Sequence, residues 1–198
     1  GKVMHSMNYA TAPTTSRSGF HGCSAIRNTF ALACDADHGG IVVVDYEDTS
    51  ASYTSRALSY PLDNHRIGTL SEHPKSPYLI GNFAGENNKF HLLAFDPTDT
   101  SALDESHIQT LAERQSKADA EMVVVWLQSG KLQVYKVDPE WSLVTEILVI
   151  EGMMACTDAS MVTGYGQALV MAPATQMLYA LDLTQVDHGE SIKVYEYN

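Results

Sequence analysis

The sequence predicts an all-β fold built from repeated four-stranded units, and three observations predict it. Short runs of valine, isoleucine, leucine and tyrosine alternate with glycine, aspartate, asparagine and proline, the pattern of strands joined by tight turns. One unit recurs four times: a strand of small residues, a more apolar strand, a strand that ends in an acid, and a polar outer strand. Near-continuous apolar runs such as 41-IVVVDY-46 and 122-MVVVWL-127 suit strands that are covered on both faces. This rhythm is that of a β-propeller blade and favours a β-propeller over a β-sandwich.

The four units follow one another without long insertions. Residues 20–62 read CSAIR, FALACD, GIVVVDYED and SYTSRALSY, and residues 63–115 read HRIGTLSEH, PYLIGNFA, KFHLLAFDPTD and SHIQTLAE. Residues 116–151 contain EMVVVWLQSG, KLQVYKVDPEW and LVTEILVIE, with a turn at Ser129-Gly130. Residues 152–198 read TDASMVTGYG, QALVMAPAT, QMLYALDLTQ and SIKVYEYN. For 107-HIQTLAERQSKADAEM-122, which has some helical character, we expect an outer strand and a loop.

Residues 1–19 suggest the outer part of a preceding blade. Four complete blades and a remainder are expected to form part of a larger ring rather than a free four-bladed one. Such a portion would leave sheet faces uncovered, so it would need a second chain, or the other half of the ring, to be stable.

Composition narrows the function classes. The chain has 198 residues, 44% of them hydrophobic, which suffices for a sizeable core. Its 24 acidic against 12 basic residues argue against nucleic acid as a partner, because phosphate binding needs a cationic face. No apolar run approaches the roughly 20 residues of a membrane span. No signal peptide is visible, and because the chain begins GKVMHSMNY we expect Gly1 to be a processing boundary with any targeting sequence upstream.

Histidines near the starts of innermost strands are the candidate metal ligands. His21 precedes the first strand of its unit, His65 holds a comparable place in the next, and Asp158 does so in the last. His5 would come from the preceding blade. Innermost strands begin at one mouth of a propeller channel, so these side chains could converge on zinc, which neutral imidazoles and carboxylates bind. The alternative is a set of polar residues at a wet channel mouth.

The three cysteines allow more than one interpretation of their structural role. Cys23 and Cys34 flank a predicted hairpin and could face each other as a disulfide, or remain two buried thiols. Cys156 has no evident mate. His38 and His188 share the contexts ADHGG and VDHGE, which suggest exposed turns with a surface metal site as the less favoured reading, and His91 suits a strand face.

Signatures of enzymes are absent from the sequence. It contains no GxSxG elbow, HExxH, P-loop or EF-hand loop, and 164-GYGQAL-169 joins two strands as a hairpin turn rather than a nucleotide loop. We therefore expect a protein that is not an enzyme.

Three segments resemble one family, the periplasmic zinc metallochaperones of the AztD type. The segment 20-FHGCSAIRNTFALACDAD-37 is similar to the family's HG segment, and 65-HRIGTLSEHPKSPYLIGNF-83 to its following RIG blade. The segment 167-QALVMAPATQMLYALDL-183 resembles the last blade, although many propellers share that pattern.

The resemblance implies a periplasmic β-propeller that binds zinc and passes it to the solute-binding protein of an ABC zinc importer. His21 matches the family's HG histidine, and His65 lies beside the RIG match. Two features depart from the family: no His-rich segment is present, and Cys23 follows the HG pair where the family has a cysteine before it. A metal-free scaffold for protein binding and, ranked lower, a lactonase-type hydrolase with acids around the channel remain alternatives.

Overall fold

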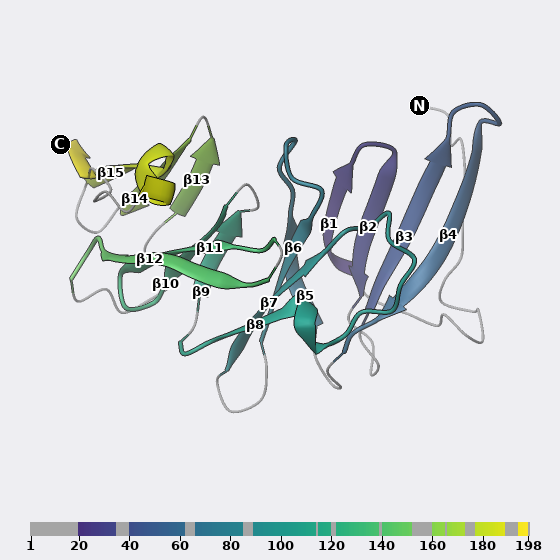
Figure 1. Ribbon diagram of the computed structural model, residues 1–198, viewed down its shortest axis with the longest axis horizontal. Helices are drawn as coiled ribbons and strands as arrows, with labels where there is room; N and C mark the ends of the chain where they lie inside the picture. The colour runs from purple at the N-terminus through teal and green to yellow at the C-terminus, as the bar shows by residue number, and fades with distance from the viewer. Residues whose placement is uncertain are drawn as a thin grey trace. The chain divides into compact units, whose positions relative to one another are not determined.

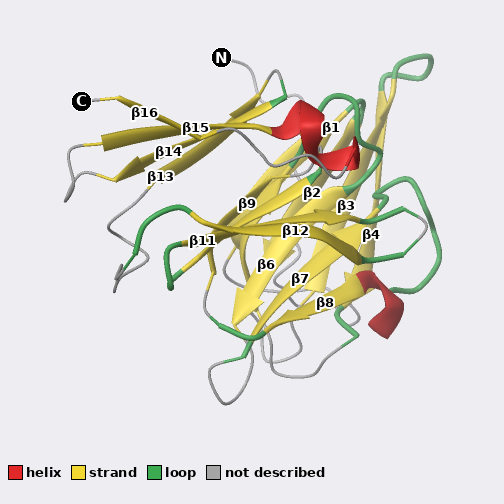
Figure 2. Ribbon diagram, turned by 60° about the vertical axis from the view of Figure 1, so that its left-hand side comes forward, coloured by secondary structure: helices red, strands yellow, loops and turns green. Residues whose placement is uncertain are grey.

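The computed structural model describes residues 20–34, 40–61, 66–84, 89–113, 115–119, 122–138, 140–151, 160–164, 166–172, 177–188 and 194–197. In this part of the chain, strands β1 to β16 form four antiparallel sheets of four strands each (Figures 1 and 2). The prediction of an all-β fold with four four-stranded units is confirmed. No helix in the described ranges is long and apolar enough to cross a membrane.

Sheets 1 and 2 follow the units that the sequence predicts, and sheet 3 adds one strand to its predicted unit. Sheet 1 consists of β1 (Phe20–Ile26), β2 (Thr29–Cys34), β3 (Gly40–Glu47) and β4 (Ser52–Ser59). Sheet 2 consists of β5 (Arg66–Ser71), β6 (Leu79–Ala84), β7 (Phe90–Phe95) and β8 (Ile108–Leu111). Sheet 3 consists of β9 (Gln115–Asp119), β10 (Val123–Leu127), β11 (Lys131–Lys136) and β12 (Ser142–Leu148).

Sheet 4 completes the set with β13 (Ser160–Gly164), β14 (Gln167–Ala172), β15 (Met177–Asp182) and β16 (Val194–Tyr197). Two 3-10 helices accompany the strands, η2 (Glu105–His107) before β8 and η4 (Leu183–His188) after β15. Tight turns join the strands where the sequence predicts them. Gly130, with φ 80°, and Gly166, with φ 72°, take the left-handed conformation that turns of this kind need.

One stretch departs from the prediction. The loop expected within residues 107–122 contains β9, which pairs with β10 in the register Val124↔Asp119 and Val125↔Ala118. The sequence QSKAD has no alternation of apolar residues. Its strand state therefore comes from backbone pairing with the buried β10 and not from intrinsic preference.

The chain forms two compact units, one of residues 1–87 and 91–109 and the other of residues 88–90 and 110–198. In the first unit, sheets 1 and 2 share one core, made of Ile26, Ala31, Ala33, Ile41, Val43, Leu58, Tyr60, Ile67, Leu70, Leu79, Leu93 and Phe95. In the second unit, sheets 3 and 4 share a core of Val124, Trp126, Leu132, Val134, Ile150, Met161, Ala168, Val170, Tyr179, Leu181 and Leu183. Burial of these apolar side chains between paired sheets is the main stabilising contribution within each unit.

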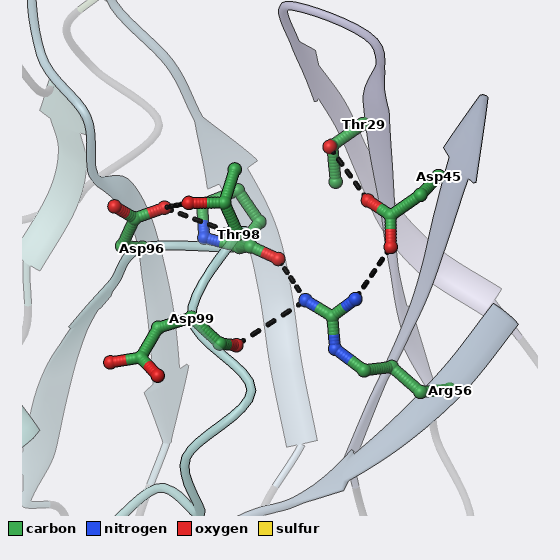
Figure 3. A network of polar contacts seen from close by, with 7 residues as sticks. Thr29, Asp45, Arg56, Asp96, Thr98 and Asp99 are labelled. Atoms are coloured by element: carbon green, nitrogen blue, oxygen red, sulfur yellow. Dashed lines mark hydrogen bonds and ion pairs between the residues drawn. The ribbon is translucent and has the colours of Figure 1, made fainter. Parts of the chain in front are cut away.

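An arginine ties sheet 1 to sheet 2 at the rim of their core (Figure 3). Arg56 on β4 forms an ion pair of 2.5 Å with Asp45 on β3, and Asp45 also accepts a hydrogen bond of 2.7 Å from Thr29 on β2. The other arm of the Arg56 guanidinium donates to the carbonyl oxygens of Pro97 and Asp99, which follow β7. The planar donor fork of arginine suits this simultaneous contact with a carboxylate and two carbonyls.

The acid that ends the third strand of a unit has a structural role. Asp96 accepts hydrogen bonds from the backbone N–H and hydroxyl of Thr98, at 2.8 and 2.7 Å. Asp182 does the same for Thr184, at 2.9 and 2.6 Å. These local bonds fix the turn that leaves the strand.

Candidate functional site

The first strand of sheet 1 begins with a β-bulge at His21. Phe20 pairs with Cys34 and Gly22 pairs with Ala33, so His21 is the extra residue between two paired positions. The structure describes the backbone of His21 but not its side chain. A bulge bends its strand and redirects the extra residue, and bulges are frequent beside functional sites.

The residue after the bulge brings two strands into backbone contact. A Cβ built on Gly22 would lie 3.1 Å from the Cα and the carbonyl carbon of Thr69 and from the backbone nitrogen of Leu70. Thr69 and Leu70 are both residues of β5. Only glycine allows this approach without displacing backbone atoms. In the HG pair, the candidate ligand His21 is therefore followed directly by Gly22, the residue that lets β1 pack closely against β5.

Polar side chains continue along these two strands. The Ser24 hydroxyl on β1 donates to the Glu72 carboxylate just beyond β5, and the Asn82 amide on β6 donates to the Thr69 hydroxyl. Glu72 and Thr69 are exposed. Hydroxyl, amide and carboxylate oxygens are thus available to solvent beside the HG pair. Sequence analysis did not single out these four residues, because only the packing of β1 on β5 and the pairing of β5 with β6 bring them together.

The bulge recurs in the next sheet and changes the expected alignment of the histidines. In β5, Ile67 pairs with Phe83 and Thr69 pairs with Asn82, so Gly68 is the extra residue. Gly68, and not His65, is therefore the counterpart of His21 in sheet 2.

The remaining predicted ligands, His65, His5 and Asp158, lie outside the described residues, as does Cys156. His38 and the side chain of His188 do so as well. The metal site predicted at His21, His65, His5 and Asp158 therefore stays a prediction. Among the residues that the structure describes, no three His, Cys, Asp or Glu side chains lie close enough together to hold a metal ion.

The predicted Cys23–Cys34 disulfide needs correction. Cys23 is a free, exposed thiol, and it pairs with Leu32, whereas Cys34 pairs with Phe20 and Gly40. The two cysteines are therefore diagonal neighbours and not opposite each other.

Three other histidines are placed by the structure. His91 is buried within β7, as the sequence predicts for a strand-face histidine. His107 ends η2, and its Nδ1 lies 2.9 Å from the carboxylate of Asp104. His73 accepts a hydrogen bond of 3.3 Å from the backbone N–H of Lys75. Each of these histidines has a local structural partner or a core position.

Comparison with known proteins places the fold. A structure of apo AztD from Citrobacter koseri superposes with a TM-score of 0.69 and 20% sequence identity over 91% of this chain. A second crystal structure of Citrobacter koseri AztD gives a TM-score of 0.66 and 22% identity over 90% of the chain. The chain has the AztD-type fold. It spans 46% of the length of each of these AztD chains.

At 20–22% sequence identity, the similarity to AztD shows the fold alone. A scan against models of protein families found no match, and a search of curated proteins found none either. In this chain the HG pair lies at the start of β1, the first strand of sheet 1. Its position there is marked by the bulge at His21 and by the close approach of Gly22 to β5.

Proposed function

We propose that this chain is the zinc-binding portion of a periplasmic metallochaperone, which passes Zn²⁺ to the solute-binding protein of an ABC zinc importer. One observation carries the proposal: His21, in the segment that resembles the AztD-type HG motif, occupies a β-bulge at the start of the first strand of an AztD-type fold. The proposal treats zinc as cargo and assigns no reaction to the chain.

A site at a strand start suits a metal that must be released. Zinc that is held by three or fewer protein ligands keeps a coordination position open, through which an incoming ligand from a partner can exchange. His21 would supply an imidazole nitrogen to such a set. The net charge of −12 favours the approach of a divalent cation, and it would also favour a partner surface that carries the opposite charge.

Zinc binding of this kind depends on pH in a known direction. An imidazole binds Zn²⁺ only when its ligating nitrogen is unprotonated, so binding weakens as the pH falls below the ordinary histidine pKa of about 6.5. A chaperone whose site depends on His21 therefore holds zinc at neutral pH and releases it in mild acid.

Zinc transfer to a solute-binding protein tests the proposal. The chain is loaded with one equivalent of Zn²⁺, freed of excess metal and mixed with the apo form of a periplasmic zinc-binding protein. Direct transfer predicts that the partner gains zinc faster than a chelator of equal affinity does, because ligand exchange bypasses free Zn²⁺. Equal rates for partner and chelator would mean that the chain only releases zinc into solution, which contradicts a chaperone role.

A metal-free scaffold is the second candidate, and the exposed apolar side chains of sheet 4 favour it. A scaffold binds its partner equally well with and without a chelator, and after replacement of His21. A partner complex that forms only with the zinc-loaded chain would exclude it.

A further inference from the structure

Two β-bulges lie side by side in the first compact unit. His21 is the extra residue of the bulge in β1, and Gly68 is the extra residue of the bulge in β5. The residues that follow them, Gly22 and Thr69, are in contact, since a Cβ on Gly22 would lie 3.1 Å from the Thr69 Cα. His21 and Gly68 therefore lie at the same level of two neighbouring strands. One of them has an imidazole and the other has no side chain.

The two glycines of this region differ in what their surroundings require. At Gly22 an added methyl group would meet backbone atoms of β5, so packing requires a glycine there. Among the residues that the structure describes, a Cβ on Gly68 would meet within 4 Å only Asn82, its side-chain Oδ1 at 3.3 Å and its carbonyl oxygen at 4.0 Å. Because the end of a side chain can move aside, the space at Gly68 admits a larger residue.

The backbone conformation does not require a glycine at position 68 either. Gly130 and Gly166 have a positive φ, which favours glycine, whereas the φ of Gly68 lies outside the left-handed region. Gly68 is also exposed to solvent. Within the described part of the chain, neither packing nor backbone conformation therefore accounts for a glycine beside the bulge at His21.

An open side next to a metal ligand has a chemical use. Zinc passes from one protein to another by ligand exchange, and the incoming ligand needs a free coordination position on the metal. A donor side chain on β5 at the level of His21 would fill that position. The polar groups nearest to Gly68 are the Asn82 amide and the Thr69 hydroxyl, which bond to each other. Zinc prefers imidazole and thiolate to such neutral oxygens.

We propose that Gly68 forms the exchange opening of the zinc site, through which a partner's imidazole or carboxylate reaches zinc held by His21. This inference rests on the proposed function, in which His21 binds zinc as cargo. A glycine at the second bulge adds no ligand, so it limits the affinity of the site and leaves the metal accessible from the side of β5. A donor side chain at the same place would turn a transfer site into a storage site.

Gly68→His tests the proposal, because it places a second imidazole at the level of His21. Competition with a chromogenic chelator should show zinc binding that is tighter by at least roughly tenfold than in the native chain. Transfer to the apo form of a periplasmic zinc-binding protein should slow by a similar factor. X-ray absorption spectroscopy of the zinc-loaded chains should count one more imidazole on the metal in the variant.

Two further variants serve as controls. Gly164→His adds a histidine on β13, where a Cβ would meet nothing within 4 Å, and it should bind and transfer zinc like the native chain. Gly68→Ala adds a side chain without a donor atom, so it should fold and should match the native affinity. Circular dichroism checks the fold of each variant. A Gly68→Ala chain that does not fold would give the glycine a structural reason and would overturn the inference.

The outcomes separate this inference from the proposed function. If the native chain binds and transfers zinc but Gly68→His changes neither affinity nor transfer rate, the exchange opening is wrong and the chaperone role stands. Tighter binding without slower transfer would mean that exchange takes another route, and equal tightening by Gly164→His would mean that any added histidine suffices; both contradict the inference. A native chain that binds no zinc would overturn the proposed function, and this inference with it.

Discussion

The backbone of Gly22 lies directly against that of Thr69, so that a Cβ on Gly22 would come within 3.1 Å of the Thr69 Cα. This contact joins the first strand of sheet 1 to the first strand of sheet 2 one residue after the bulge at His21. Because the contact is this tight, the packing of β1 on β5 beside the candidate ligand depends on a glycine at position 22.

Gly22→Ala should destabilise the chain by about 1–3 kcal/mol, because the added methyl group meets backbone atoms that cannot rotate away. Urea unfolding, followed by circular dichroism, measures the change. Gly164→Ala is the matched control on β13, since a Cβ there would meet nothing within 4 Å, and its effect should stay within about 0.5 kcal/mol. Equal effects of the two substitutions would show that the close approach at Gly22 does not matter for stability.

Arg56→Ala should cost about 1–2 kcal/mol of unfolding free energy, because it removes the hydrogen bonds from the guanidinium to Asp45, Pro97 and Asp99. The pair is partly exposed, with side-chain exposures of 25% and 34%, which keeps the expected loss below that of a buried pair. Arg56→Lys should recover only part of the stability, because an ammonium group cannot span the same three acceptors.

Lys131→Ala provides the comparison, since its pair with Glu146 is more exposed, at 41% and 36%. The expected loss is about 0–1 kcal/mol. If Arg56→Ala proved as mild as Lys131→Ala, the contact in Figure 3 would not be one of the interactions that hold sheets 1 and 2 together.

The stability of the chain should fall in acid partly through Glu146. Hydrogen bonds from Lys131, at 2.8 Å, and from Gln133, at 2.7 Å, lower the pKa of Glu146 below its ordinary value. Because the folded-state pKa is lowered, this contribution to stability is complete above the ordinary glutamate pKa and disappears as the pH falls through the lowered value. Glu146→Gln should therefore be less stable than the native chain at neutral pH, and the difference should shrink below about pH 4.

Unfolding at a series of pH values checks this sign. A Glu146→Gln variant whose deficit stays constant from neutral pH to pH 3 would show that the ionised carboxylate contributes nothing to the pH dependence. The pKa of Asp104 is lowered in the same way, mainly by the hydroxyl and backbone N–H of Ser106, so Asp104→Asn should show the same trend.

The strand pattern could be predicted from sequence because its signals are local. Ser129-Gly130 and the acids Asp96 and Asp182 mark turns and strand ends that the structure confirms. The strand β9 could not be predicted, because Gln115–Asp119 owes its conformation to β10 and not to its own residues.

The candidate site could be predicted less fully than the strands from the sequence, for two physical reasons. A β-bulge shifts the register by one residue and carries no clear residue signature, so the alignment of His21 with Gly68 instead of His65 appears only in the pairing. The contact between Ser24 and Glu72 spans 48 positions of the chain and depends on how two sheets pack. The sequence could not decide between a Cys23–Cys34 disulfide across a predicted hairpin and two buried thiols, whereas in the structure Cys23 is a free, exposed thiol.

The central claim is that His21 binds zinc, and a zinc titration of the native chain against a chromogenic chelator tests it most directly. His107→Ala is the control, because this histidine contacts Asp104 on η2 and not the HG pair. The account predicts one tight site in the native chain and in His107→Ala, and clearly weaker binding in a folded His21→Ala variant. Tight binding that His21→Ala leaves unchanged, or no tight binding by the native chain, would contradict it.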